Sequence, residues 1–159
     1  MKALSHRAIL YAMRKKGLVI LLLEDDENDV FFVQRATAKA NSNHHLLPVH
    51  NGDEAIRYLR GERPYADRLK FPLPSLILTD LKMPRMDGLE FLRWRRASLR
   101  WSLVPTVMFS GSGLEKDIRE AYRLGANSYF TKPGDHTHLV QILRAILEYW
   151  AVAERPGAR

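Results

Sequence analysis

The stretch Leu18-Val19-Ile20-Leu21-Leu22-Leu23-Glu24-Asp25-Asp26 places an uninterrupted aliphatic run directly before a run of acids. A run this short and this apolar is typical of a strand buried on both faces, as in a parallel sheet. Further runs of the same kind occur at Leu46–Val49, Leu76–Thr79, Thr106–Phe109 and Ser128–Thr131. The sequence therefore predicts five short, buried strands.

Segments with helical spacing lie between these runs. Apolar or small residues share one face in two of them, at Val30, Val33, Thr37 and Ala40 and at Ile118, Ala121, Tyr122 and Gly125. The clearest stripe is the last, formed by Leu139, Ile142, Leu143, Ile146, Leu147 and Trp150. Alternation of strand and helix predicts a single α/β domain, with a doubly wound five-stranded parallel sheet and five helices. Residues 60–75 carry three prolines and are expected to form a long surface loop.

Positive charge is concentrated at the start of the chain. The 159 residues carry a formal net charge of +7, which raises the question of a nucleic acid partner. Residues 1–17 account for +5 of it, whereas residues 18–150 carry only +1. We therefore expect a basic N-terminal extension (1–17), one folded domain (18–150) and a short C-terminal tail (151–159), with the extension outside the functional part.

Two classes of protein are excluded by composition. The chain has no cysteine, which rules out disulfides, thiolate zinc sites and cysteine nucleophiles. Its longest aliphatic run, Leu18–Leu23, is far shorter than the roughly 20 residues that a membrane-spanning helix needs. That run leads into acids rather than into a small-residue cleavage site, so it is not a signal peptide either. We expect a cytoplasmic protein.

Charged and hydroxyl side chains follow four of the predicted strands. Glu24 and Asp25 follow the first, Asp80 the third, Ser110 the fourth and Lys132 the fifth. In an open α/β sheet, ligands bind outside the carboxyl ends of the strands, so these groups are expected to meet at one edge. Taken singly, each has an ordinary explanation, as a helix cap, a turn residue or a solvated lysine. Their conjunction at matching strand ends is the informative feature.

The conjunction suggests phosphoryl-transfer chemistry. Clustered carboxylates repel one another unless a cation intervenes, and Mg²⁺ (or Mn²⁺) is the usual oxygen-bound ion where phosphate is handled. A carboxylate can also act as the nucleophile and become an aspartyl phosphate. Lys132 could then neutralise phosphoryl oxygens, and the hydroxyl of Ser110 could donate a hydrogen bond to one.

With these residues at these positions, the chain resembles a known family, the receiver domain of bacterial two-component response regulators. The matching stretches are LLLEDD at 21–26, LTDLKMPRMDG at 78–88, Ser110, and GANSYFTKP at 125–133. Within the family it is similar to the small stand-alone regulators that partner bacterial phytochrome kinases. The residues that carry this second resemblance are GERPYADR at 61–68, PLP at 72–74, and Tyr149-Trp150.

The resemblance implies a flavodoxin-like receiver fold over residues 18–150 and a role for each site residue. Asp80 would be the phosphoacceptor, and Asp25 would bind the metal directly with help from Glu24. The backbone carbonyl of Lys82 would be a further metal ligand. Because the Lys82 side chain is expected near the phosphoryl site, we also predict that it changes the lifetime of the phosphate. Ser110 would hold one phosphoryl oxygen and Lys132 another.

Two further features follow from the same resemblance. Tyr129 is similar to the switch aromatic of the family, whose ring moves inward when Ser110 shifts toward the phosphate; a half-buried strand aromatic is the ordinary alternative. The Lys132–Pro133 bond is expected to be a cis peptide.

The resemblance also implies the partners. The phosphodonor would be a sensor histidine kinase, such as a bacteriophytochrome. The chain itself would be a phosphoacceptor signalling protein rather than an enzyme, with metal-dependent self-phosphorylation and self-dephosphorylation. We expect no separate output domain, so that output passes to a downstream protein target, to a histidine phosphotransfer protein or through a homodimer. The homodimer would use the face formed by residues 118–125, 128–131 and 139–150, including the apolar helix end at Ile146, Tyr149, Trp150 and Val152.

The sequence also offers alternatives to this function. A dehalogenase-like phosphatase needs an acid two residues after the nucleophile, where Lys82 stands. A dinucleotide-binding domain needs a glycine-rich turn after the first strand, where acids stand. A phosphorelay intermediate remains an alternative, and so does a nucleic-acid-binding patch built on Arg93, Arg95, Arg96 and Arg100 with Trp94 and Trp101. For that patch, a solvated helix with Trp94 or Trp101 turned to the core is the preferred explanation.

Overall fold

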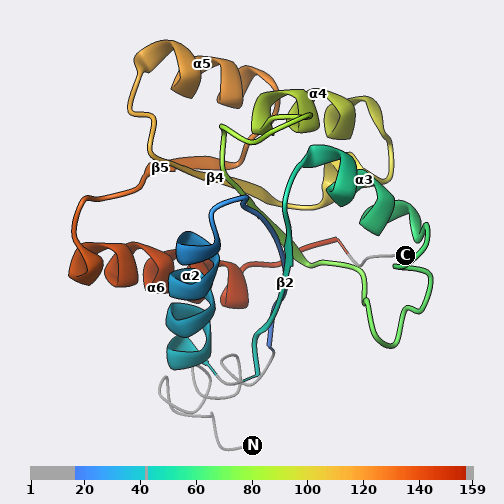
Figure 1. Cartoon of the computed structure of the whole chain (residues 1–159), viewed down its shortest axis with the longest axis horizontal. Coiled ribbons are helices and arrows are strands. Elements are labelled where there is room, and N and C mark those ends of the chain that lie inside the picture. The colour runs from blue at the N-terminus through green and yellow to red at the C-terminus, as the bar shows by residue number, and fades with distance from the viewer. Residues whose placement is uncertain (1–16, 42, 157–159) are drawn as a thin grey trace, which may run out of the picture.

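In the part of the chain that the structure describes, five strands and five α-helices alternate, as the sequence predicts (Figure 1). The structure is a computed structural model that describes residues 17–41 and 43–156. Except for Gly17, the predicted basic extension therefore lies outside the described residues. The elements are β1 (Val19–Leu23), α2 (Glu27–Ala40), β2 (His45–Val49), α3 (Gly52–Arg60), β3 (Leu76–Thr79), α4 (Gly88–Ala97), a short 3₁₀ helix (Trp101–Leu103), β4 (Thr106–Ser110), α5 (Glu115–Arg123), β5 (Ser128–Thr131) and α6 (His136–Val152).

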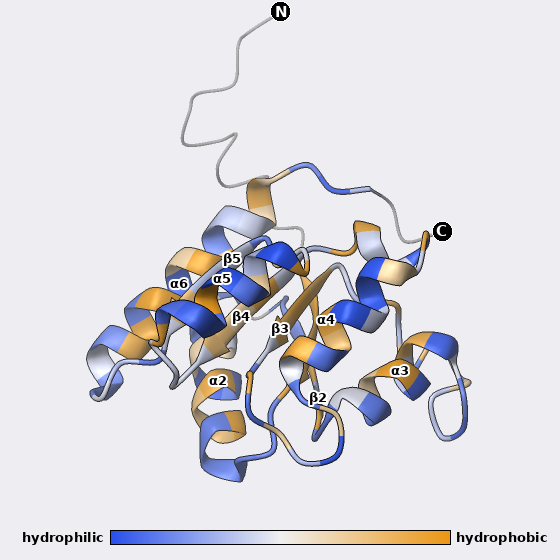
Figure 2. Ribbon diagram, turned by 90° about the horizontal axis from the view of Figure 1, so that it is seen from above, coloured by the Kyte–Doolittle hydropathy of each residue, from blue (hydrophilic) through white to orange (hydrophobic). Residues whose placement is uncertain are grey.

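The sheet is parallel throughout, with the strand order β2-β1-β3-β4-β5. Helices α2 and α6 pack together on one face, and α3, α4 and α5 cover the other (Figures 1 and 2). Alternate residues of β1 serve the two cores: Ile20 and Leu22 pack on the α2 and α6 side, whereas Leu21 and Leu23 pack on the α3 side. Because both faces are covered, the strands read as continuous apolar runs.

The predicted helix faces hold for α6 and only partly for the others. Leu139, Leu143 and Leu147 are buried as expected, but the predicted face of α5 is displaced. That helix ends at Arg123, and Gly125 beyond it adopts a φ of 93°. The turn brings Leu124 into the core and leaves Tyr122 half exposed. In the first helix Ala40 lies at the exposed end, and Ala36 fills the core position instead.

Side-chain caps fix where the helices next to the site begin. Asp26 accepts hydrogen bonds from the backbone N–H groups of Asn28 and Asp29, so the cap of α2 is Asp26 and Asp25 is left free of that task. Asp135 caps α6 as predicted, by accepting from the N–H of His138. The last helix continues to Val152, into the segment predicted as a tail.

One backbone prediction is wrong. The Lys132–Pro133 bond is not cis; the cis bond among the described residues joins Arg63 to Pro64 in the long loop before β3. The trans form is the default for a bond to proline, and the chain leaving β5 crosses to the opposite face of the sheet before α6 rather than turning tightly. Residues 61–75 form turns without helix or strand, as expected. Within the described residues, no helix is both long and apolar enough to cross a membrane.

Candidate functional site

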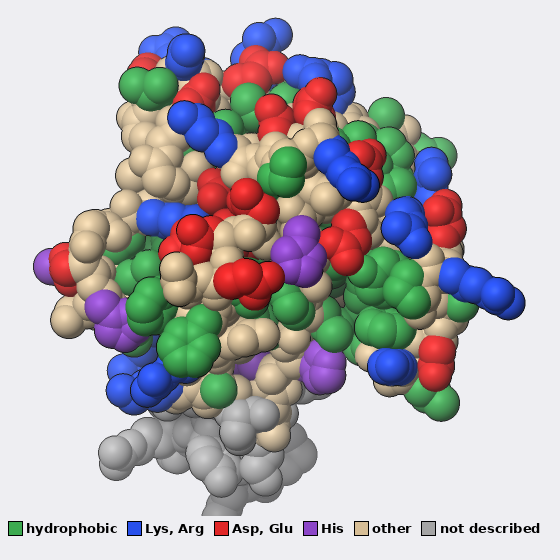
Figure 3. Space-filling model, viewed as in Figure 1, with side chains coloured by type: hydrophobic (Ala, Val, Ile, Leu, Met, Phe, Trp, Pro, Cys, Tyr) green, Lys and Arg blue, Asp and Glu red, His purple; other side chains and the backbone are tan. Residues whose placement is uncertain are grey.

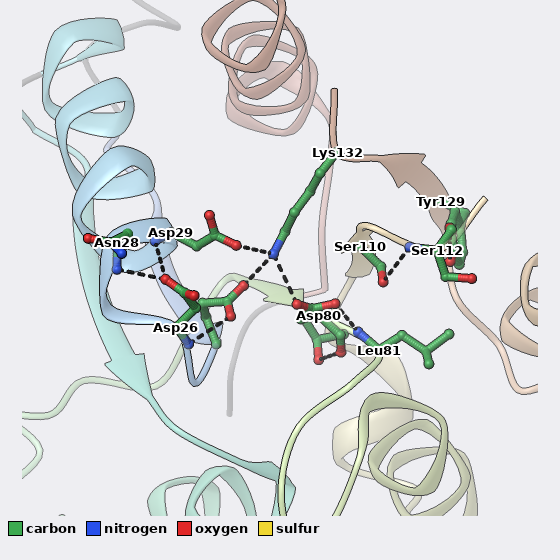
Figure 4. A network of polar contacts seen from close by, with 11 residues as sticks. Asp26, Asn28, Asp29, Asp80, Leu81, Ser110, Ser112, Tyr129 and Lys132 are labelled. Atoms are coloured by element: carbon green, nitrogen blue, oxygen red, sulfur yellow. Dashed lines mark hydrogen bonds and ion pairs between the residues drawn. The ribbon is translucent and has the colours of Figure 1, made fainter. Parts of the chain in front are cut away.

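Three carboxylates converge at the carboxyl edge of the sheet, where Figure 4 shows Lys132 pointing toward Asp29 and Asp80. Parallel pairing sets Leu23 of β1 beside Thr79 of β3, so the residues that follow them, Glu24 and Asp80, are neighbours. One oxygen from each of Glu24, Asp25 and Asp80 lies within 4.8 Å of the other two. Glu24 is buried, Asp80 half-buried and Asp25 exposed, so the cluster runs from the core to the surface. The sequence predicted this convergence correctly.

Lys132 arrives from the end of β5 and lies among the acids. Its Nζ atom is 2.6 Å from Glu24 Oε2, 2.7 Å from Asp29 Oδ2 and 2.9 Å from Asp80 Oδ2, and its side chain is only 12% exposed. Asp29 is the partner that sequence reasoning missed. It stands in the first turn of α2, three residues after the cap residue Asp26. That spacing is the signal that could have placed it on the side facing the site.

The electrostatics of the cluster favour an added cation. Burial raises the pKa of Glu24 from 4.5 to about 7, and the Lys132 ammonium only partly offsets that. Burial also acts to lower the pKa of Lys132, but hydrogen bonds to Asp29 and Glu24 outweigh it and the pKa is raised. Four carboxylates lie at this edge, and Lys132 pairs with three of them. Such an excess of oxygen donors and negative charge fits a hard divalent ion such as Mg²⁺ or Mn²⁺.

Figure 3 shows the same feature from outside, where acidic side chains gather in the middle of the face seen in Figure 1. Basic side chains are more frequent toward the upper rim and the sides of that view. The surplus of negative charge is therefore local to the sheet edge, although the chain as a whole is basic.

Ser110 and Tyr129 lie on the strands beside Asp80. Ser110 ends β4 and is buried, and its backbone carbonyl accepts a hydrogen bond from the N–H of Lys132 at 2.8 Å. Tyr129 of β5 is half-buried, and its hydroxyl donates to the carbonyl of Ser112 at 2.7 Å. Burial raises the pKa of Tyr129, so its hydroxyl remains a donor at neutral pH. Lys82, two residues after Asp80, has an exposed side chain, and the role of its carbonyl stays a prediction.

Two residues of the predicted basic-aromatic patch, Arg95 and Trp101, make structural contacts, whereas Arg93, Arg96 and Arg100 are exposed. Arg95 is 3% exposed and donates to the backbone carbonyls of Ser102, Val104 and Gly125. Trp101 is also buried. The preferred explanation, with an aromatic ring turned to the core, is therefore correct, and it extends to an arginine that the sequence had placed in solvent.

An aspartate directly after a parallel strand, with acids beside it and a lysine and a hydroxyl from neighbouring strands, is the arrangement of a phosphoacceptor domain on a flavodoxin-like sheet. The chain belongs to the response regulator receiver domain family, which its residues 20–144 match. The predicted family and fold are thereby confirmed.

Its relatives include regulators associated with phytochromes. The chain is 31% identical over 132 residues to the response regulator Rcp1 of Synechocystis, covering 83% of this chain and 88% of Rcp1. The crystal structure of the phosphorylated cyanobacterial phytochrome response regulator RcpA superposes with a TM-score of 0.82 at 36% identity, covering 89% of this chain and 100% of RcpA. The Mn²⁺-bound form of Rcp1 superposes with a TM-score of 0.80 at 30% identity, covering 89% and 100%.

These relationships confirm the resemblance to phytochrome-linked regulators. Receiver domains are phosphoacceptors in two-component signalling and are phosphorylated by sensor histidine kinases. They bind Mg²⁺ or Mn²⁺, and Rcp1 is known in a Mn²⁺-bound form. The acidic cluster of Glu24, Asp25 and Asp80 agrees with that cofactor.

Proposed function

We propose that this protein accepts a phosphoryl group from the phosphohistidine of a sensor kinase onto Asp80. The observation that carries the proposal is the position of the Asp80 carboxylate directly after β3, where it clusters with Glu24 and Asp25 and lies 2.9 Å from Lys132 Nζ. A second polar contact fixes its orientation, because Asp80 Oδ1 accepts a hydrogen bond from the N–H of Leu81 at 2.6 Å.

The transfer itself is a substitution at phosphorus. A carboxylate oxygen of Asp80 forms the new P–O bond, the P–N bond to the donor histidine breaks, and the imidazole leaves with that electron pair and takes up a proton. Lys132 faces the phosphoryl oxygens with its ammonium, and the Ser110 hydroxyl donates a hydrogen bond to one of them. Both groups are held in place by the fold, which is how protein groups stabilise charge without reorganising.

The residues proposed to hold the divalent ion are Asp25 and Asp80 directly, Glu24 in support, and the backbone carbonyl of Lys82. When bound, the ion would neutralise the charge of the carboxylates and of the incoming phosphoryl group. Asp29 has a different task in this scheme: its contact with Lys132 Nζ keeps the ammonium at the site when Asp80 carries the phosphoryl group.

The test is phosphorylation by a small phosphodonor in the presence of Mg²⁺, followed by intact-mass measurement. The wild-type chain should gain one phosphoryl group, and Asp80→Asn should gain none. Asp53→Asn, which changes an exposed carboxylate at the start of α3, is the matched control and should be phosphorylated like the wild type. Absence of added mass in the wild type would sink the proposal.

The kinase is proposed to dock on α2, next to the acids. Phe31 and Phe32 are 51% and 36% exposed, and the Phe32 ring packs on His136 at the start of α6 with centroids 5.0 Å apart. Exposed aromatic side chains beside a reactive site are typical of a protein interface. Phe31→Ala should slow transfer from a phosphorylated bacterial phytochrome kinase at least about tenfold, a loss of ~1.4 kcal/mol. Phosphorylation by the small donor should be unchanged, and equal slowing of both reactions would argue against docking there.

Output is proposed to pass through the α5–β5–α6 face, as a homodimer. Tyr149 is 63% and Val152 37% exposed at the end of α6, and a cavity of about 450 Å³ lies between that helix and β5, lined by Phe130, Ala145 and Trp150 among others. Ile146, which the sequence assigned to the same surface, is buried in the core and can contribute little. Sedimentation of wild type and Tyr149→Ser, with and without phosphorylation, tests this surface; identical monomeric behaviour throughout would refute it.

A further inference from the structure

In the loop between β4 and α5, Ser112 connects Ser110, Tyr129 and the first turn of α5. Ser112 uses each of its polar groups, and Figure 4 shows its contact with Ser110. Its backbone N–H donates to Ser110 Oγ at 3.3 Å, its carbonyl accepts from the Tyr129 hydroxyl at 2.7 Å, and its own hydroxyl donates to Asp117 Oδ2 at 2.5 Å. The hydroxyl oxygen also accepts from the N–H of Leu114 at 3.4 Å.

The rest of this loop offers little to hold it. Gly111 and Gly113 flank Ser112; an added Cβ at Gly111 would meet nothing within 4 Å, and one at Gly113 would make only ordinary contact with Thr131. The residue at the cap position of α5, Leu114, has no side chain that caps the helix. The bond from Ser112 to Asp117 therefore links an otherwise loosely held loop to the first turn of α5, where a carboxylate is also favoured by the helix dipole.

We infer that Asp117 is a positioning residue, which acts through Ser112 to make Ser110, Tyr129 and α5 respond to phosphorylation as one unit. The inference rests on the proposed function, in which Ser110 senses the phosphoryl group on Asp80. When the Ser110 hydroxyl turns toward a phosphoryl oxygen, its contact with the Ser112 N–H changes. Because Asp117 holds Ser112, that displacement is passed to α5 as well as to the ring of Tyr129.

Loss of the hydrogen bond between Ser112 and Asp117 should uncouple α5 from Ser110. If Asp117 no longer holds the Ser112 hydroxyl, the two glycines allow the loop to absorb the movement of Ser110. Phosphorylation would then still alter Ser110, but the start of α5 would no longer follow. This helix belongs to the face proposed for output, so the loss would separate chemistry from signalling.

The experiment compares backbone amide chemical shifts before and after addition of Mg²⁺ and beryllofluoride, a stable mimic of the phosphoryl group. In the wild type, shifts should change at Ser110, at Tyr129 and along α5. In Asp117→Ala the change at Ser110 should persist, while the changes along α5 should fall by at least half. Asp117→Asn keeps an oxygen that can accept from Ser112 and should restore the α5 response, which a charge effect alone would not do.

Glu115→Ala is the matched control, because Glu115 is also an acid in the first turn of α5 but pairs with Arg119 on the exposed side. It should leave the α5 response at the wild-type level. Ser112→Ala should reproduce the loss seen in Asp117→Ala, and the double variant should lose no more than either one. A full α5 response in Asp117→Ala, or an equal loss in Glu115→Ala, would overturn the inference. No response at Ser110 in the wild type would instead overturn the proposed function, and the inference with it.

Discussion

Two cationic side chains in the described part of the chain, Lys132 and Arg95, are shielded from solvent in opposite ways. Lys132 lies at the carboxyl edge of the sheet and contacts three carboxylates, whereas Arg95 lies under the loop after α4 and contacts only backbone carbonyls. The pKa values move accordingly: that of Lys132 is raised because its ion pairs outweigh burial, and burial lowers that of Arg95 to about 10. The neutral surroundings of Arg95 suit a structural contact, while the acidic surroundings of Lys132 leave charge to be neutralised by something that binds.

The comparison implies that chemistry and stability reside in different places. Arg95 Nη1 donates to carbonyls in the chain before β4, and Nη2 donates to the carbonyl of Gly125 in the α5–β5 turn. The guanidinium therefore ties α4 to both segments. Around Lys132, the carboxylates are held together against their mutual repulsion, which costs stability until a cation is present. In most of a protein, local features such as packing and charge pairing stabilise the fold. Functional sites are the common exception, because they keep charges that destabilise it.

Lys132→Ala should have the largest effect, on chemistry. Loss of the ammonium removes the group that faces the transferred phosphoryl oxygens, so phosphorylation by a small donor should slow by about 10²–10³-fold. The rate of mass gain at saturating Mg²⁺ measures it. Lys116→Ala, in which an exposed lysine of α5 is removed, is the control and should match the wild type. A Lys132→Ala rate within threefold of the wild type would contradict the assigned role.

Arg95→Met should have the next largest effect, on stability. Methionine keeps the apolar stem but leaves three backbone carbonyls without their donor, which should lower the free energy of unfolding by about 3 kcal/mol. Urea denaturation measures the loss. The neighbouring Arg96→Met, at an exposed position, should cost under about 0.5 kcal/mol. The phosphorylation rate of Arg95→Met should stay close to that of the wild type. A large loss of rate without loss of stability would contradict the assignment of Arg95 to stability and of Lys132 to chemistry.

Glu24→Gln should stabilise the metal-free protein. The folded-state pKa of about 7 lies above the unfolded value of 4.5, so folding favours the protonated carboxyl. That contribution is fully present below pH 4.5 and is lost as pH rises through 7, which leaves the charged Glu24 as a burden at pH 8. Glutamine avoids it, and we expect a gain of about 1–2 kcal/mol at pH 8 without metal.

The gain from Glu24→Gln should shrink when Mg²⁺ is added, because the ion stabilises the wild type more than the variant. Unfolding midpoints at pH 5 and pH 8, with Mg²⁺ and with a chelator, give the four values needed. A variant that is less stable than the wild type at pH 8 without metal would show that the pairing of Glu24 with Lys132 outweighs its burial.

The sequence predicted the position of the functional cation, Lys132, but not that of the structural one, Arg95. Strand ends in a parallel sheet must meet, so Glu24, Asp80 and Lys132 could be brought together from order alone. Arg95 was assigned to solvent because arginine is rarely buried, although its spacing from Phe91 and Leu92 places it on the apolar face of α4. That signal was present, but the three carbonyls that pair with it come from segments whose positions depend on tertiary packing.

Contacts that depend on the direction of side chains also could not be predicted from the sequence. The bond of Asp29 to Lys132 spans 103 positions of the chain, and the bond of Ser112 to Asp117 forms only because the glycine-rich loop curls back on α5. Neither follows from the order of strands and helices. The same holds for the face of α5, where the helix stops before Gly125 and so turns Leu124 inward instead of Tyr122.

His50 is a third cationic side chain, and unlike Lys132 and Arg95 it is exposed. Its substitution should have the smallest effect of those considered. Its ring nitrogens are 3.0 Å from Glu27 and 3.2 Å from Glu54, and hydrogen bonding to Glu27 raises its pKa above 6.5, although half of the side chain is exposed. The stabilisation is fully present below pH 6.5 and is lost as pH rises through the raised pKa of the folded state. His50→Gln should therefore lower the unfolding temperature more at pH 6 than at pH 9, with a difference worth only a few tenths of a kcal/mol, about what an exposed pair contributes. Added salt should reduce that difference further, because exposed charges are screened. A larger loss at pH 9 than at pH 6 would mean that His50 acts through its packing, and that exposure does not separate it from Lys132 and Arg95.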